Sequence, residues 1–173
     1  YIIVSFLNAT MIFNIGEIIE KVTDSGFLCN TLTIYCGLLG NDILIQVYPK
    51  GIRLIHNDGR IKEWKPPNNK KIIKCSLNIK QVLISLNNNK LIYFELDKNL
   101  NLKEILKKLY KKDIIDITIA PKSIGNTKSL FCSIALNDNS IRILSLNINT
   151  ILERKSIVLL GNDNINKPYN ILL

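Results

Sequence analysis

One pattern constrains the fold of this chain more than any other: a β-hairpin is repeated four times along it. Each copy has an apolar strand, a polar turn of two to four residues and a second apolar strand. The second strands begin at Asn8, Lys50, Asn89 and Asn139, so the copies are spaced by 42, 39 and 50 residues. A period near forty residues with paired strands is typical of β-propeller blades. Because blades stack around an axis and mostly build binding surfaces, the repeat favours binding over catalysis.

Each full blade can be interpreted as four strands, with the hairpin in the middle. The predicted first hairpin strands are Ile2–Phe6, Ile43–Tyr48, Val82–Leu86 and Phe131–Leu136, and the second contain Thr10–Phe13, Ile52–Ile55, Leu91–Phe94 and Ile141–Leu144. The predicted innermost strands are Leu32–Leu38, Ile72–Leu77 and Ile114–Ala120, and the outermost are Ile61–Trp64, Leu102–Leu106 and Arg154–Leu159. The innermost strands are nearly continuously apolar, which predicts that both of their faces are covered.

The fold class that follows is all-β: a segment of a WD40-like β-propeller with about three full blades and partial blades at both ends. The expected boundaries are 1–28 for a partial blade, 29–67, 68–112 and 113–160 for three blades, and 161–173 for the start of the next. Because the chain opens inside a strand at Tyr1–Val4 and closes on another at Asn170–Leu173, we expect a piece of a longer propeller.

Two regions are ambiguous in the sequence. Residues 100–110 place Leu102, Ile105, Leu106 and Leu109 at helical spacing, but the blade repeat predicts an outer strand there. The third blade carries an insertion at Pro121–Lys128, which is either a partner contact or tolerated slack; we favour slack.

The net charge of +9 invites a nucleic-acid interpretation. However, Lys outnumbers Arg 19 to 4, and 31 Ile and 22 Asn accompany it, as a bias toward A/T-rich codons would produce. Lys also gathers in turns such as 107–112, where solvent is its natural environment. We therefore favour a solvated surface and keep RNA binding through a Lys-rich edge as an alternative.

Cysteine and histidine residues indicate no metal site. The thiols Cys29, Cys36, Cys75 and Cys132 form no C-x-x-C pair, and the single histidine, His56, stands apart from them. Cys36 and Cys75 are 39 residues apart, which places them at equivalent positions of two innermost strands. We expect small buried residues and unpaired thiols, which fit a reducing compartment.

The sequence contains no recognisable catalytic arrangement, so we expect no catalytic, cofactor-binding or metal-binding residues. His56 lacks triad partners, and we expect a packing or surface role. The scattered carboxylates would allow a glycosidase pair without selecting one; they are Asp24, Glu63, Asp97, Asp113, Asp116 and Asp138. No apolar run reaches the roughly 18 residues of a membrane-spanning helix, so no membrane partner is expected. Because no catalytic arrangement is found, no small-molecule substrate is expected either.

Trp64 and two arginines are the remaining candidates for contacts. Trp64 ends an outer strand before Pro66–Pro67; it is either an exposed anchor for a partner or an indole that closes the gap between blades, and we favour the second. Arg53 and Arg142 occupy the same strand position in two blades, but two residues do not establish a basic stripe.

Several longer stretches resemble a known family. They are Tyr1–Thr10, Ile15–Glu17, Glu20–Leu28, Gln46–Arg53, Glu63–Pro67, Leu91–Glu95 and Asp138–Leu146. Together they look like the large β-propeller subunits of the splicing factor 3b complex. The blade skeleton is also similar to that of the damaged-DNA-binding large subunits and the large cleavage and polyadenylation factor subunits, which lack the opening around Asn8–Thr10.

The resemblance implies a middle, seven-bladed propeller in a nuclear, non-catalytic scaffold of pre-mRNA splicing that acts in branch-site recognition with the U2 snRNP. The implied partners are the helical-repeat large subunit and small subunits of that complex, with only indirect association to snRNA and pre-mRNA and no cofactor. The alternatives are an adaptor of a cullin ubiquitin ligase in DNA repair or of mRNA 3′-end processing. The Asn/Lys-rich loops, such as 87–89, 99–112 and 162–166, depart from the family.

Overall fold

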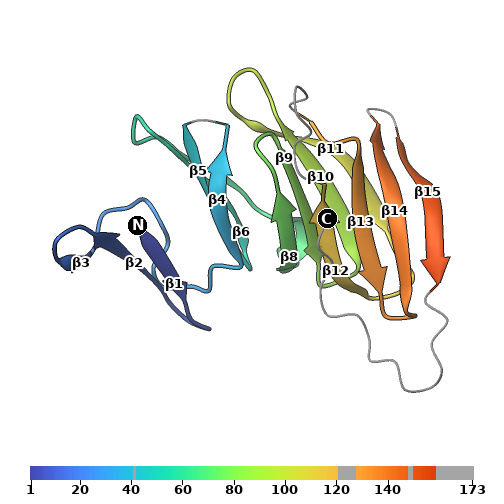
Figure 1. The fold of residues 1–173 in the computed structure, drawn as a ribbon, viewed down its shortest axis with the longest axis horizontal. Coiled ribbons are helices and arrows are strands. Elements are labelled where there is room, and N and C mark those ends of the chain that lie inside the picture. Colours follow the sequence, from blue (N-terminus) through green and yellow to red (C-terminus); the bar gives the residue numbers. More distant parts are fainter. Residues whose placement is uncertain (41, 121–127, 148–149, 159–173) are drawn as a thin grey trace. The chain divides into compact units, whose positions relative to one another are not determined.

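The computed structural model describes residues 1–40, 42–120, 128–147 and 150–158, which are almost entirely β-strands and turns (Figure 1). The chain divides into two compact units, Tyr1–Ile72 and Ile73–Leu173, and each is described by itself. Within the described ranges, no helix has the length and apolar character needed to cross a membrane. The predicted insertion at 121–128, apart from Lys128, and the predicted blade start at 161–173 lie outside the described residues.

The first unit contains two antiparallel sheets. Strands β1 (Ile2–Ser5), β2 (Thr10–Ile15) and β3 (Ile19–Lys21) form a three-stranded sheet in chain order. Strands β4 (Tyr35–Leu39), β5 (Ile43–Tyr48), β6 (Gly51–His56) and β7 (Ile61–Trp64) form a four-stranded sheet, also in chain order, followed by a 3₁₀ turn at Pro67–Asn69. Strands β5 and β6 occupy the centre of that sheet and carry most of its buried side chains.

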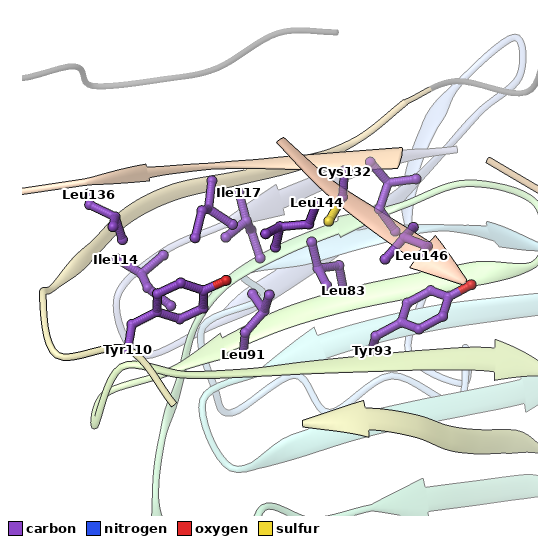
Figure 2. Close-up of a cluster of buried hydrophobic side chains, with 12 residues drawn as sticks. Leu83, Leu91, Tyr93, Tyr110, Ile114, Ile117, Cys132, Leu136, Leu144 and Leu146 are labelled. Atoms are coloured by element: carbon purple, nitrogen blue, oxygen red, sulfur yellow. The ribbon is translucent and has the colours of Figure 1, made fainter. Parts of the chain in front are cut away.

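The second unit contains two four-stranded antiparallel sheets. One consists of β8 (Ile72–Leu77), β9 (Gln81–Leu86), β10 (Lys90–Leu96) and β11 (Leu102–Leu109). The other consists of β12 (Ile114–Ile119), β13 (Phe131–Leu136), β14 (Ser140–Asn147) and β15 (Thr150–Val158). Figure 2 shows side chains of both sheets meeting in one apolar cluster, in which Leu83, Leu91 and Tyr93 face Cys132 and Leu144.

The predicted hairpins are confirmed, and their turns show why. Asn89 and Asn139 have φ values of 60° and 61°, the left-handed conformation that asparagine tolerates better than most residues. Their amides donate to the carbonyls of Leu86 and Leu136 at 3.0 and 3.2 Å, which closes both turns. Gly51 has a different reason: a Cβ there would lie 2.6 Å from the carbonyl oxygen of Trp64.

The segment with helical spacing is a strand, β11, as the repeat predicted. The register between β10 and β11 shifts between Tyr93 and Phe94, so Ile105 is an extra residue on the outer strand. This β-bulge interrupts the two-residue alternation, which allows Ile105 and Leu106 both to pack against the apolar cluster. The equivalent shift occurs between Ile143 and Leu144 in the next sheet. The bulge between β10 and β11 therefore accounts for the helix-like spacing of apolar residues in β11.

Three expectations about strands need correction. The first strand of the 29–67 segment begins at Tyr35 rather than Leu32, because the amides of Thr33 and Ile34 bond Ser5 Oγ and the carbonyl of Val47 instead of extending the regular ladder. Strand β15 begins at Thr150 instead of Arg154.

The third correction concerns burial. The expectation of innermost strands covered on both faces is wrong for β4, β8 and β12, which contain one, one and three buried residues, whereas five of the six residues of β13 are buried. The first strand of each sheet is an edge strand, with a hydrogen-bonded neighbour on one side only.

Candidate functional site

A buried glutamine joins the two sheets of the first unit. Gln46, on the central strand β5, is fully buried. Its Oε1 accepts from the amide of Leu28 at 2.9 Å, and its Nε2 donates to the carbonyl of the same residue at 3.1 Å. The second Nε2 proton goes to Thr33 Oγ1 at 2.8 Å. The side-chain amide thus pairs with the backbone of the connection before β4 as a strand would.

The polar chain continues to the three-stranded sheet. The Thr33 and Thr10 hydroxyls lie 2.7 Å apart, and Thr10 Oγ1 donates to the carbonyl of Thr31 at 2.8 Å. Both threonines are buried, so these groups are satisfied by one another in place of water. We call Gln46, Leu28, Thr33, Thr10 and Thr31 the Gln46 network. Every member of this network is uncharged.

A second buried glutamine makes the same arrangement in the second unit. Gln81, on β9, is fully buried. Its Oε1 accepts from the amide of Ser129 at 2.5 Å, and its Nε2 donates to the Ser129 carbonyl at 2.9 Å. Asn78 Nδ2 also donates to Oε1, at 2.8 Å, and Nε2 also donates to the hydroxyl of Tyr93, at 2.6 Å. We call Gln81, Ser129, Asn78 and Tyr93 the Gln81 network.

This second network ends in a charge pair. Tyr93 donates its hydroxyl proton to Glu95 Oε1 at 2.7 Å, and Glu95 Oε2 pairs with Lys128 Nζ. Burial, with the nearby Glu95 carboxylate, raises the pKa of Tyr93, so the phenol stays a neutral donor at physiological pH. The chain of donors runs from the buried amide to a carboxylate near the surface.

Neither glutamine was identified as a site residue from the sequence. A signal was present for Gln46, which lies within the predicted apolar strand Ile43–Tyr48. Gln81 precedes the predicted strand Val82–Leu86, and only the structure includes it in β9, Gln81–Leu86. A polar amide on such a strand must find partners because burying it unpaired costs about 1–3 kcal/mol.

The structure places His56 at the end of β6, buried, which confirms the packing interpretation. Its backbone amide donates to the carbonyl of Arg60 at 2.9 Å, across a turn that contains Gly59. Burial lowers the pKa of the imidazole, and the positive charges of Lys62 and Arg60 lower it further. The ring therefore favours its neutral form.

Trp64 is half-buried at the end of β7 and lies opposite Ile52. That its indole closes the gap between blades, rather than anchoring a partner, stays a prediction. Arg53 donates to Glu63 Oε1 at 2.8 Å, so it belongs to a local ion pair. Arg53 and Arg142 do share a register position, because they face Gln46 and Ile134 on the preceding strands.

The thiols are less uniform than expected. Cys36 and Cys75 lie on β4 and β8, the first strands of their sheets, but both are half-buried, and Cys29 is exposed. Only Cys132 fits the prediction of a buried thiol, and burial raises its pKa to about 12. In the part of the chain that the structure describes, no three His, Cys, Asp or Glu side chains are grouped to hold a metal.

Five of the six carboxylates that we considered for catalysis make structural contacts, Glu63 through its pair with Arg53, and the sixth, Asp24, is exposed. Asp97 accepts from the amides of Asn99 and Asn101, both at 2.8 Å, and so orders its own turn. Asp113 accepts from the side-chain amides of Asn89 and Asn137 at 2.8 and 2.9 Å, which links two hairpin turns.

The remaining carboxylates act locally as well. Asp116 lies 3.8 Å from Lys74, and Asp138 accepts from the Ser140 hydroxyl at 2.5 Å. These contacts hold turns and strands in place, which is the chemistry of a framework.

Repeated four-stranded antiparallel sheets with buried central strands are the arrangement expected of β-propeller blades. The chain belongs to the family described as the RSE1/DDB1/CPSF1 second beta-propeller, whose model matches residues 1–171. The propeller fold predicted from the repeat is thereby confirmed.

Within this family, the chain is similar to proteins named as splicing factors. The chain is 46% identical over 158 residues to "Splicing factor 3B subunit 3" of Danio rerio, and 46% identical over 153 residues to the protein of that name in Drosophila melanogaster. It is 44% identical over 157 residues to "Spliceosome-associated protein 130 A" of Arabidopsis thaliana. These alignments cover 88–91% of the chain but only 12–13% of each relative. The chain therefore corresponds to a small part of the relatives that it matches.

Proposed function

We propose that this chain is part of a non-catalytic scaffold in pre-mRNA splicing, a subunit of a splicing factor 3B complex. The observation that carries the proposal is its 44–46% identity, over most of the chain, to relatives named as splicing factor 3B subunits or spliceosome-associated proteins. The proposal includes a nuclear location and contacts to the other subunits of that complex, with RNA approached only through them.

The structural argument for a scaffold is rigidity. Gln46 bonds a backbone segment 18 residues earlier in the chain, and Gln81 one 48 residues later. Such long-range contacts of buried side chains fix loops relative to sheets, which lowers the entropy lost when a partner binds. We propose further that the three four-stranded sheets are the blades at 29–67, 68–112 and 113–160, which present their turns and edges to partners.

The experiment is affinity purification of the full-length protein from its own cells at endogenous level, followed by mass spectrometry. The expected result is stoichiometric recovery of the other splicing factor 3B subunits. Recovery of cullin-ligase subunits or of cleavage and polyadenylation factors in their place would overturn the proposal in favour of one of the two adaptor alternatives.

A further inference from the structure

A groove of about 840 Å³ opens at one end of the β4–β7 sheet in the first unit. Three segments line it: the connection before β4, the β5–β6 turn, and the end of β7 with the loop that follows. The lining contains four lysines, Lys50, Lys65, Lys70 and Lys71, and a single carboxylate, Glu63. The splicing-scaffold proposal leaves this feature unexplained.

The groove has a net positive charge that its own carboxylate does not balance. Glu63 Oε1 accepts from Arg53 at 2.8 Å, so much of its charge is already neutralised by a residue outside the lining. Its other oxygen lies 4.0 Å from Lys65. Within the described ranges, Lys50 and Lys70 have no carboxylate partner. Positive charge concentrated in a recess strengthens the attraction for an anionic ligand.

The wall of the groove is held in place by its backbone. The amide of Ile72 donates to the carbonyl of Pro49 at 2.9 Å, which joins the loop after β7 to the β5–β6 turn. The amide of Lys70 donates to the carbonyl of Pro67 at 3.3 Å, around two asparagines, Asn68 and Asn69, with φ values of 55° and 52°. Lys50 and Lys70 therefore extend from connected, ordered segments.

The rest of the lining decides between the two common classes of polyanion. The one aromatic side chain that lines the groove is Tyr48, which is 5% exposed and offers no face for stacking a base. Single-stranded RNA relies on such stacking, so the groove lacks half of the usual recognition. Leu28, which is half-buried, supplies apolar surface, and the exposed Asn30 and Asn69 supply amide groups that can bond a peptide backbone.

We propose that this groove binds an acidic peptide segment of a protein partner, in which glutamate or aspartate alternates with apolar residues. The proposal rests on the scaffold function, because it assigns one partner contact to a scaffold. Lysine suits this ligand because each ammonium group pairs with a carboxylate from several directions, so no bidentate geometry is needed.

The test measures binding of a fluorescein-labelled peptide of alternating glutamate and leucine to the full-length protein by fluorescence anisotropy. We expect Lys50→Glu/Lys70→Glu to weaken binding at least about tenfold, because two attractions become repulsions. Lys50→Arg/Lys70→Arg keeps the charges and is expected to bind as the unmodified protein does. Lys111→Glu/Lys112→Glu makes the same change in net charge at exposed positions of the other unit and should have little effect.

Each outcome decides. Equal loss in the Lys111/Lys112 variant, or no peptide binding by the unmodified protein, would overturn the proposal, since net charge or another surface would then account for the data. Stronger binding of a labelled oligouridine, lost in the Lys50/Lys70 variant, would assign the groove to RNA and overturn it as well. Unchanged hydrogen exchange of β5 and β6 shows that the variant remains folded.

The scaffold function is judged separately. Recovery of splicing factor 3B subunits with the unmodified protein tests that function alone, whatever the peptide does. A protein that recovers those subunits but binds no peptide would lose only the groove proposal, whereas peptide binding without those subunits would remove only the scaffold proposal.

Discussion

The Gln46 and Gln81 networks use the same bonding pattern in two units and differ in where the pattern ends. Both glutamines are fully buried, and each pairs its amide with the N–H and C=O groups of one backbone residue, Leu28 or Ser129. The Gln46 network passes to uncharged threonines. The Gln81 network passes through Tyr93 to Glu95, which pairs with Lys128.

The difference also concerns burial of the backbone that is held. Ser129 is 6% exposed, whereas Leu28 is half-buried. Water can therefore replace a lost partner more readily at Leu28 than at Ser129, and the cost of an unmade hydrogen bond depends on that replacement. One bonding pattern thus has different energetic consequences in the two units, and four experiments can separate them.

The largest effect is expected for Gln81→Ala. The substitution leaves the N–H and C=O groups of Ser129 without their side-chain partner, removes one bond each from Tyr93 and Asn78, and creates a cavity, at a cost of about 3 kcal/mol. Hydrogen exchange of the Ser129 amide in the full-length protein should accelerate by about a hundredfold. Exchange in β5 and β6 of the other unit serves as the control, and acceleration there would mean general unfolding.

Gln46→Ala should have a smaller effect of the same kind. It removes three hydrogen bonds, but the Leu28 backbone can turn to water, so we expect about 2 kcal/mol and roughly thirtyfold faster exchange of the Leu28 amide. Exchange at Ser129 should not change. A loss equal to or greater than that of Gln81→Ala would break the proposed link between backbone burial and cost.

A third experiment compares Tyr93→Phe in the Gln81 network with Thr10→Val in the Gln46 network. Tyr93→Phe removes a hydroxyl that bonds a charged acceptor, which predicts about 1.5 kcal/mol, whereas Thr10→Val removes bonds between uncharged groups and should cost about 1 kcal/mol. Each substitution removes a hydroxyl with little change in the shape of the side chain, so the lost hydrogen bonds dominate its cost. Exchange at Ser129 and at Leu28 reports the two costs, and a reversed order would show that the charge of Glu95 does not strengthen its network.

The smallest effect concerns pH. Burial lowers the pKa of His56 below its ordinary value of 6.5, so the unfolded state binds a proton more readily than the folded state. The contribution of His56 to the free energy of unfolding is therefore fully present above pH 6.5 and is lost as the pH falls below 6.5. Exchange in β6, corrected for the intrinsic rate, should accelerate in this range, and His56→Gln should remove the acceleration.

The second unit contains no histidine and is the internal control. Asp58, whose pKa its neighbour Arg60 lowers to about 2, titrates far below this range, so it does not contribute to the effect. Equal acceleration in both units would contradict the assignment to His56.

Much of the fold was predictable because turns and alternation are local. Asn89 and Asn139 adopt left-handed conformations that the Asn-rich turns favour, and strands β5, β7, β8 and β13 have the predicted bounds. The start of β4 was not predictable, because Thr33 is held by hydrogen bonds to Ser5 and Gln46, and both partners are distant from it in the sequence. The spacing in β11 misled for the same reason: a bulge set by pairing with β10 interrupts the alternation.

Sequence by itself determined the repeat, the all-β class and the family, because the period of about forty residues and the matching stretches are properties of residue order. Only the tertiary structure decided which buried polar residues connect segments within each unit and where the lysines form a groove. Gln46 and Leu28 are 18 residues apart, Gln81 and Ser129 are 48 apart, and Lys50 and Lys70 line the same groove from a turn and a loop. Such contacts depend on how strands stack, and a linear pattern with a period of two records only which face a side chain takes.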